Sequence, residues 1–267
     1  MKLSRFTAFS CSFLLAGVVA LTGASAAQAN QQVQAVDYVA LGDSYSSGVG
    51  AGSYDGSSCK RSSKAFPALW AAKSAPASFK FAACSGARTG DVTSGQLSSL
   101  SAATDLVSIT VGGNDAGFAD VMTTCVLQGE SACISRVNTA RAYVDTTLPG
   151  LLDSVYDGIR AKAPSARVVV LGYPRFYKIA GTCSVGLSEK SRSAINAAAD
   201  HLNTATAKRA ADHGYTFAGV AGSFTGHEIC TPAPWLHSLK WTNIGESYHP
   251  TAAGQSGGYL PVFTSAA

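Results

Sequence analysis

Short apolar runs recur along the chain, and each ends near glycine or another small residue. Residues 38–41 are followed by Gly42, and residues 168–171 are followed by Gly172. An apolar run of this length, bounded by turn residues, is typical of a strand buried on both faces of a sheet. The pattern predicts five strands, at residues 38–41, 79–84, 106–111, 168–171 and 215–220.

Apolar residues at helical spacing fill the segments between these runs. Residues 67–73 and 137–162 carry such patterns, with a turn or break expected at Pro149-Gly150. Ser188 is placed to cap a further helix that runs to His213 and stops at a glycine. Strands that alternate with helices predict an α/β fold, in which helices cover both faces of a central parallel sheet as a three-layer α/β/α sandwich.

The first residues have the features of a secretory signal peptide. Lys2 and Arg5 precede an apolar run over residues 6–21, and small residues ending in Ala27-Gln28-Ala29 follow. A membrane anchor is the alternative, but the run is short for a membrane span and ends in a cleavage-type sequence. We therefore expect a signal peptide at residues 1–29, a single domain at residues 30–267, and a secreted, extracellular protein.

The composition narrows the class of protein further. Hydrophobic residues make up 46% of the 267 positions, which excludes a disordered chain. Charged residues make up only 13%, against about 25% in typical domains. Without Lys2 and Arg5, 18 basic and 16 acidic residues remain. This thin, mixed charge excludes an electrostatic nucleic-acid binder and is compatible with transient contact with a neutral lipid surface.

The chain has seven cysteines, an odd number. The expected signal peptide explains this, because cleavage would remove Cys11 with it. Six cysteines then remain: Cys59, Cys84, Cys125, Cys133, Cys183 and Cys230. An even number in an exported chain predicts three disulfides, although the sequence alone allows about 15 pairings. Zinc binding is the competing interpretation. It is disfavoured because the chain has no C-x-x-C pair, and His227-Glu228 is not followed by the second histidine of H-E-x-x-H.

Candidate catalytic residues follow the predicted strands. Ligands of parallel α/β sheets bind outside the carboxyl ends of the strands. Glycine-rich polar blocks stand at the first three of these ends, and a fourth block lies near the C-terminus. The blocks are Gly42-Asp43-Ser44-Tyr45-Ser46-Ser47-Gly48, Cys84-Ser85-Gly86-Ala87, Gly112-Gly113-Asn114-Asp115 and Glu246-Ser247-Tyr248-His249-Pro250.

Together these blocks resemble the SGNH, or GDSL, family of serine hydrolases. The family signature is a serine in G-D-S, a glycine in a second block, an asparagine in G-x-N-D and a late histidine, and all four occur here in that order. The six cysteines and the S-Y-H-P ending look most like the secreted Streptomyces-type lipases and esterases, including their phospholipase A1 relatives. The resemblance implies the α/β/α fold of that family.

The resemblance also implies a role for each residue of the quartet. Ser44 would be the nucleophile and His249 the base, whose ordinary pKa suits proton transfer near neutrality. The backbone N–H groups of Ser44 and Gly86 and the side-chain amide of Asn114 would form an oxyanion hole. Taken alone, Ser44, Gly86 and Asn114 could each be an ordinary turn or capping residue. The four other histidines are expected to be structural or at the surface, with His213 at a helix C-terminus.

The group that orients His249 is open between two candidates. Many family members carry aspartate three residues before the histidine, and here that position is Glu246. The alternative is the main-chain carbonyl of Ser247, which would make a Ser-His dyad. We favour the carbonyl because the longer glutamate would have to fold back. Asp43 and Asp115 are expected to hold their own loops by binding nearby backbone N–H groups.

The resemblance further implies disulfides between neighbouring cysteines: Cys59–Cys84, Cys125–Cys133 and Cys183–Cys230. Two other motifs are rejected. Residues 254–258 come close to G-x-S-x-G, but no strand precedes them and no histidine follows. Residues 48–52 are glycine-rich but lack the lysine of a phosphate-binding loop, so they predict a flexible loop by the active site.

The sequence therefore predicts a secreted serine ester hydrolase, a lipase or esterase that forms an acyl-enzyme on Ser44 and degrades lipid. Its substrates would be fatty-acyl esters such as triacylglycerols and p-nitrophenyl esters, with no cofactor and no metal. Phospholipase A1 and carbohydrate acetylesterase are the alternatives within the enzyme class. A non-catalytic secreted binding protein is the alternative outside it. We expect a monomer.

Overall fold

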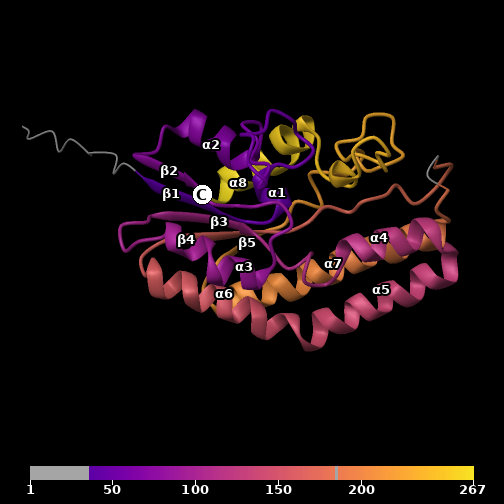
Figure 1. The fold of residues 1–267 in the computed structure, drawn as a ribbon, viewed down its shortest axis with the longest axis horizontal. Coiled ribbons are helices and arrows are strands. Elements are labelled where there is room, and N and C mark those ends of the chain that lie inside the picture. Colours follow the sequence, from indigo (N-terminus) through magenta and orange to yellow (C-terminus); the bar gives the residue numbers. More distant parts are fainter. Residues whose placement is uncertain (1–35, 184–185) are drawn as a thin grey trace, which may run out of the picture. The chain divides into compact units, whose positions relative to one another are not determined.

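The computed structural model describes residues 36–183 and 186–267, which contain a five-stranded parallel sheet (Figure 1). The strand order is β2-β1-β3-β4-β5, and every neighbouring pair is parallel. The strands are β1 (Asp37–Gly42), β2 (Ser78–Phe81), β3 (Leu106–Thr110), β4 (Arg167–Leu171) and β5 (Thr216–Ala218). All five lie where the apolar runs predict them. The expected signal peptide at residues 1–29 lies outside the described residues.

The edge strand β2 is shorter than predicted because its ladder with β1 ends early. The backbone N–H groups of Ala82 and Ala83 both donate to the carbonyl of Ala40, at 2.8 and 3.0 Å. Two donors on one acceptor break the regular spacing of a parallel ladder. The chain then turns, and the N–H of Cys84 reaches the Gly42 carbonyl at 2.9 Å. This turn brings the block that contains Gly86 to the end of β1.

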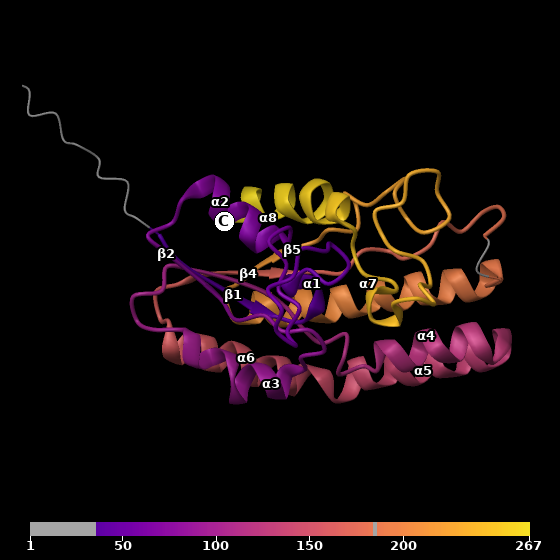
Figure 2. The same ribbon diagram turned by 45° about the horizontal axis from the view of Figure 1, so that its top comes forward.

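Helices cover both faces of the sheet, as an α/β/α sandwich requires (Figures 1 and 2). One face is covered by α2 (Phe66–Ser74), the π-helix η3 (Gly254–Tyr259) and α8 (Leu260–Ala266). The other face is covered by α3 (Thr89–Ser94), α6 (Leu148–Lys162) and α7 (Glu189–Asp212). A helical pair, α4 (Phe118–Leu127) and α5 (Gly129–Thr146), packs beside α7. Short turns are α1 (Ser44–Ser47), η1 (Gln96–Ser99) and η2 (Ile244–Glu246). The fold class predicted from the sequence is confirmed.

The long helix predicted at residues 137–162 is two helices, and the break precedes the predicted Pro149-Gly150. Pro149 occupies the first turn of α6, where its missing N–H removes no helical hydrogen bond. The predicted α7 is confirmed together with its cap, because Ser188 Oγ accepts from the N–H of Ser191 at 3.1 Å.

The sequence did not predict the helical C-terminal segment, because its glycines are typical of a loop. In the structure they let this segment pack closely against a neighbouring loop. A Cβ on Gly254 would lie 2.4 Å from the Trp235 carbonyl, and one on Gly258 would lie 2.3 Å from the Phe224 ring. Tertiary packing therefore decides this helix rather than local propensity.

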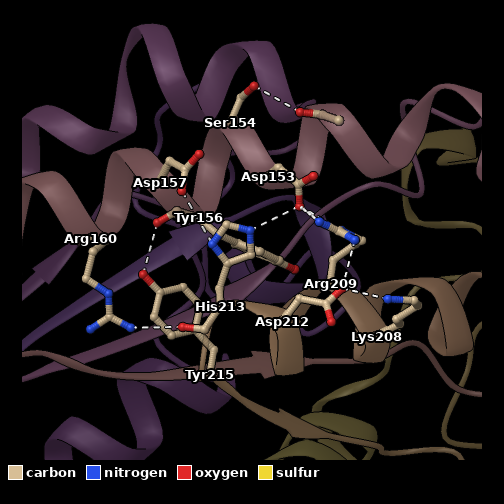
Figure 3. A network of polar contacts seen from close by, with 11 residues as sticks. Asp153, Ser154, Tyr156, Asp157, Arg160, Lys208, Arg209, Asp212, His213 and Tyr215 are labelled. Carbon is tan, nitrogen blue, oxygen red and sulfur yellow. Dashed lines mark hydrogen bonds and ion pairs between the residues drawn. The ribbon is translucent and has the colours of Figure 1, made fainter.

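Polar side chains tie α6 to the C-terminal end of α7 and to β5 (Figure 3). Asp153 of α6 binds both Arg209 Nε, at 2.6 Å, and His213 Nε2, at 3.0 Å. Arg160 donates to the His213 carbonyl at 3.0 Å, and its guanidinium lies over the Tyr215 ring. His213 thus stands at a helix C-terminus, as expected, and has a structural role.

In the described part of the chain, no helix is both long enough and apolar enough to cross a bilayer.

The central strand β3 offers a test of the core. Ile109 is fully buried between β1 and β4. Replacing it with alanine leaves a cavity, so we expect Ile109→Ala to lower the free energy of unfolding by about 2 to 5 kcal/mol, measured by urea denaturation. Leu127→Ala is the control, because Leu127 is exposed and should change this value by less than about 0.5 kcal/mol. Equal losses for the two variants would contradict this picture of the core.

Candidate active site

Ser44 stands on a tight turn between β1 and α1. Gly42 has a φ of 120°, and a Cβ there would lie 2.4 Å from the Thr110 carbonyl, so only glycine fits. Asp43 caps α1 by accepting from the N–H of Tyr45 at 2.9 Å. Ser44 therefore begins a short helix at the carboxyl end of the sheet, with its side chain largely buried.

His249 comes from the other end of the chain and contacts Ser44 directly. Its Nε2 lies 2.7 Å from Ser44 Oγ, and its Nδ1 lies 3.0 Å from the carbonyl oxygen of Ser247. Since a carbonyl can only accept, Nδ1 carries the proton and Nε2 is left to accept one from the serine. The intervening residue, Tyr248, has a φ of 66°, a left-handed conformation that turns the chain sharply between Ser247 and His249.

The surroundings of His249 keep its ring neutral. Burial lowers the pKa of His249 to about 4, although the hydrogen bond to the Ser247 carbonyl opposes that shift. The ring is therefore a free base at neutral pH. A neutral imidazole beside a hydroxyl is the arrangement that general-base activation of a serine needs.

Glu246 makes contacts other than the one proposed for an orienting acid. One carboxylate oxygen accepts from the Tyr54 hydroxyl at 2.8 Å, and the other accepts from Lys240 Nζ at 2.5 Å. The hydrogen bond from Lys240 lowers the pKa of Glu246. Of the two candidates that the sequence left open, the Ser247 carbonyl is the one that contacts His249 Nδ1.

Two of the expected oxyanion donors, Ser44 and Asn114, line one pocket, and the third, Gly86, lies in the segment that Asn114 binds. The Asn114 amide donates to the Ala87 carbonyl at 3.0 Å, which leaves its second N–H available. Gly86 has a φ of 80°, and a Cβ on it would meet no atom within 4 Å in the described part of the chain. Among the described residues, the backbone N–H groups of Ser44 and Gly86 have no acceptor. Three uncommitted donors are therefore present in these blocks.

Asp43 has the local role expected of it, because it accepts from the N–H of Tyr45, whereas Asp115 binds a different loop. Asp115 accepts from the hydroxyl of Thr89 at 2.6 Å and from its N–H at 3.2 Å, which fixes the start of α3. Asp43 accepts from Thr110 Oγ1 at 2.7 Å and from the Tyr173 hydroxyl at 2.5 Å. Burial raises the pKa of Asp43 to about 6, and these hydrogen bonds oppose the shift.

The sequence reasoning missed two tyrosines of the site. Tyr173 follows β4 at the carboxyl edge of the sheet, so its position after a strand could have indicated it. Tyr45 follows the nucleophile, and its hydroxyl donates to the Tyr248 carbonyl at 2.8 Å. Its ring centroid lies 5.2 Å from that of His249. No sequence signal indicated that Tyr45 holds the histidine turn against the nucleophile turn.

The two rejected motifs prove to be structural. In residues 254–258, Gln255 is buried, and its side chain joins the Tyr45 carbonyl, at 3.0 Å, to the N–H of Phe66, at 2.9 Å. In residues 48–52, the Gly50 carbonyl contacts His237 Nε2 at 2.8 Å. A Cβ on Gly50 would lie 2.6 Å from the Pro250 carbonyl, so this loop packs directly against the histidine turn.

The other histidines have partners outside the Ser44–His249 pair. His201 contacts Asp145 at 2.7 Å. His227 stacks on Trp235 with ring centroids 3.7 Å apart. Within the described residues, no group of three or more histidine, cysteine, aspartate or glutamate side chains is arranged to hold a metal ion.

An apolar pocket adjoins the nucleophile. Ser44 and Asn114 line it together with side chains from α4, α5 and α7. The apolar lining comes mainly from Phe118, Val121, Met122, Val144, Ile195 and Leu202. A pocket of this character suits a hydrocarbon chain attached to the reacting carbonyl.

Three disulfides surround these elements, in the pairs that the family resemblance implies. Cys59–Cys84 joins the loop after α1 to the segment of Gly86. Cys125–Cys133 joins α4 to α5, which both line the pocket. Cys183–Cys230 joins the segment after β4 to the segment that precedes the histidine turn. Each bond therefore holds a part of the candidate site.

Comparison with known proteins decides the family. The profile of the GDSL-like lipase/acylhydrolase family matches residues 40–256. The chain belongs to this family. It is therefore a carboxylic ester hydrolase, with lipase or esterase activity. Lipase 1 of Streptomyces coelicolor is 66% identical over 269 residues, with both chains covered in full.

Two solved structures agree with this family assignment and with its fold. The extracellular lipase of Streptomyces rimosus is 67% identical to this chain, with a TM-score of 0.85. Phospholipase A1 of Streptomyces albidoflavus is 68% identical, with a TM-score of 0.86. Each alignment covers 87% of this chain and 100% of the other.

The titration of His249 tests the electrostatics of the site. Because burial disfavours the imidazolium, we expect the ring to protonate with a midpoint near pH 4, below the ordinary value of about 6.5. The midpoint is measured from histidine ring signals in NMR spectra, and the His249→Gln variant assigns the signal by its loss. A midpoint at or above 6.5 would contradict the lowered pKa.

Proposed function

We propose that this protein is a secreted serine ester hydrolase that cleaves fatty-acyl esters through an acyl-enzyme on Ser44. The observation that carries the proposal is the continuous contact from Ser44 Oγ through the His249 ring to the Ser247 carbonyl, beside an apolar pocket. A signal peptide at residues 1–29 and a single mature domain at residues 30–267 complete the proposal. Three disulfides suit a protein exported to an oxidising compartment.

Acylation begins when Ser44 attacks the ester carbonyl. His249 Nε2 takes the hydroxyl proton as the new C–O bond forms, and the carbonyl π electrons move onto oxygen. The protonated ring then gives this proton to the departing alkoxide, so the alcohol leaves and the acyl group stays on Ser44. Water repeats the sequence against the acyl-enzyme, releasing the acid and restoring the hydroxyl.

The oxyanion of each tetrahedral intermediate needs donors that are already in place. The backbone N–H groups of Ser44 and Gly86 and the second N–H of Asn114 would supply them. Losing one such donor costs about 10²- to 10³-fold in kcat in serine hydrolases. The hydrogen bond from Asn114 to Ala87 supports this role, because it ties the amide to the segment of Gly86.

The contacts of His249 support a Ser-His dyad with the Ser247 carbonyl as the orienting group. The carbonyl fixes the tautomer in which Nε2 is the base, which is what the acid of a triad also does. Glu246 would act only indirectly, since Tyr54 and Lys240 already use both of its oxygens.

The apolar side chains that line the pocket support specificity for fatty-acyl esters. Phospholipase A1 activity is a second candidate, favoured by the 68% identity to the phospholipase A1 of Streptomyces albidoflavus. Hydrolysis of triacylglycerol and of phosphatidylcholine by the purified protein, compared side by side, separates the two. A sharp preference for acetyl esters over both lipids would overturn the fatty-acyl proposal.

Three substitutions test the dyad. We expect Ser44→Ala and His249→Ala to lower kcat on p-nitrophenyl butyrate by at least about 10⁴-fold, because each removes a group that takes part in bond making. Glu246→Ala should cost less than about tenfold, since Glu246 only braces the loop. Steady-state kinetics, with circular dichroism to confirm folding, gives the answer.

The dyad would be wrong if Glu246→Ala lost about 10⁴-fold in kcat while remaining folded, the scale expected for a disabled triad acid. A fluorophosphonate label provides the independent check. It should modify Ser44 in the folded protein and fail to modify the Ser44→Ala variant. Wild-type protein that resists the label would instead favour a binding protein without catalysis.

The pocket is tested by filling it. Ala199 lines it from α7, so we expect Ala199→Phe to lower kcat/KM for p-nitrophenyl decanoate by about tenfold or more while leaving the acetate ester nearly unchanged. Ala197→Phe on the exposed side of the same helix is the matched control and should leave both values unchanged. Equal losses on the two esters would show that the acyl chain does not bind in this pocket.

A further inference from the structure

The loop that precedes His249 exposes two large apolar side chains to solvent. Trp241 is 72% exposed and Ile244 is 55% exposed. Among the described residues, only two other large hydrophobic side chains, Leu127 and Ile179, are exposed to a comparable degree. Half of this exposed set therefore lies in one segment of the chain, residues 240–247.

The exposure is built into the loop, because the loop is internally closed. The N–H of Asn243 donates to the Lys240 carbonyl at 3.0 Å, which forms a turn with Trp241 at its corner. At the base, the N–H of Lys240 donates to Ser247 Oγ at 2.9 Å, and Lys240 Nζ binds Glu246. The preceding Leu239 packs against the core. The loop thus presents Trp241 and Ile244 outward from an ordered frame.

The same frame is continuous with the candidate catalytic base. Ser247 closes the loop with its hydroxyl, and its carbonyl accepts from His249 Nδ1 at 3.0 Å. The loops of residues 220–250, gold in Figure 1, lie beyond the carboxyl ends of the strands, on the side where the candidate active site is built. The loop that carries Trp241 and Ile244 is therefore joined directly to the Ser44–His249 pair.

The chemistry of the loop favours a lipid surface as the occupant of the apolar patch that Trp241 and Ile244 form. Tryptophan has an apolar ring with one N–H and is favoured at membrane–water interfaces. The loop has one carboxylate, on Glu246, and Lys240 compensates its charge, so the loop carries no net repulsion toward lipid phosphates. Because the family hydrolyses esters, a lipid surface is a phase in which such an enzyme would meet its substrate.

We propose that Trp241 and Ile244 form an interfacial anchor that inserts into a lipid–water surface and brings the Ser44–His249 site to it. The inference rests on the proposed cleavage of lipid esters. Insertion is apolar, so it should persist at high salt, where contacts between exposed charges are screened. The anchor acts on access to aggregated substrate and has no part in the chemistry of a dissolved ester.

Vesicle binding tests the anchor separately from catalysis. The full-length mature protein carrying Ser44→Ala, which cannot hydrolyse the lipid, is floated with phosphatidylcholine vesicles. We expect it to bind in 0.5 M NaCl, and the Trp241→Ala/Ile244→Ser pair to weaken binding by about tenfold or more. Leu127→Ser is the matched control, because Leu127 is 66% exposed but lies at the end of α4, and it should bind as the parent does.

Kinetics on the active protein provide the second readout. The Trp241→Ala/Ile244→Ser pair should hydrolyse dissolved p-nitrophenyl acetate within about twofold of wild type and lose at least about fivefold on emulsified triacylglycerol. Quenching of tryptophan fluorescence by brominated phosphatidylcholine should fall in Trp241→Phe, which places the inserted ring.

Several results would overturn the anchor. Vesicle binding that is absent, salt-sensitive or unaffected by the double substitution would do so, as would an equal loss in Leu127→Ser. Dimerisation that the double substitution abolishes would assign the patch to a second copy of the chain instead. Failure of wild-type protein to hydrolyse dissolved esters would contradict the proposed function. It would not change the flotation result, which measures lipid binding alone.

Discussion

The hydrogen bond between Ser44 and His249 joins residues that are 205 positions apart, and most of the polar contacts around it keep those two positions together. The nucleophile turn is fixed against β3, where glycine alone fits at position 42. The histidine turn is then bound to it by the Tyr45 hydroxyl, while the Gln255 side chain donates to the Tyr45 carbonyl. These links are buried, where hydrogen bonds are stronger and an unpaired group is costly. A site assembled from both ends of a chain depends on such links, because the two turns are joined by no short stretch of backbone.

Burial imposes a second constraint, which explains the choice of orienting group. It disfavours charge on both His249 and Asp43, so the pKa of the first falls to about 4 and that of the second rises to about 6. A carboxylate at His249 Nδ1 would add another desolvated charge to the same place. The Ser247 carbonyl fixes the same tautomer of His249 without placing another desolvated charge beside it. The candidate acid Glu246 is instead paired with Lys240, and this ion pair offsets the cost of keeping its carboxylate charged.

The pocket and the loop before His249 are likewise held by bonds between neighbouring segments. The apolar pocket is lined by helices and by the loops after β3 and β4, and a disulfide closes the α4–α5 pair that forms two of its walls. The loop that ends at His249 is closed at its base by Ser247, whose carbonyl accepts from His249 Nδ1, so the exposed Trp241 and Ile244 stand on the same hydrogen-bonded segment as the proposed base. The proposed function and the proposed anchor assign lipid contact, acyl-chain binding and proton transfer to this loop, to the pocket and to the Ser44–His249 pair.

The sequence by itself determined the five strands, because short apolar runs that end near glycines or other small residues have few other interpretations in a chain of this length. It also predicted the capped helix α7 and, through the ordered blocks, the contact of His249 with Ser44 and the place of Asn114 in the same pocket. It could not choose between Glu246 and the Ser247 carbonyl, since that depends on a left-handed Tyr248 and on partners such as Tyr54, which only the folded chain brings near. Nor could it predict the helices of residues 254–266, whose glycines are typical of a loop until Phe224 and Trp235 pack against them. Local patterns specify which elements form, whereas long-range packing decides which polar groups those elements leave beside one another.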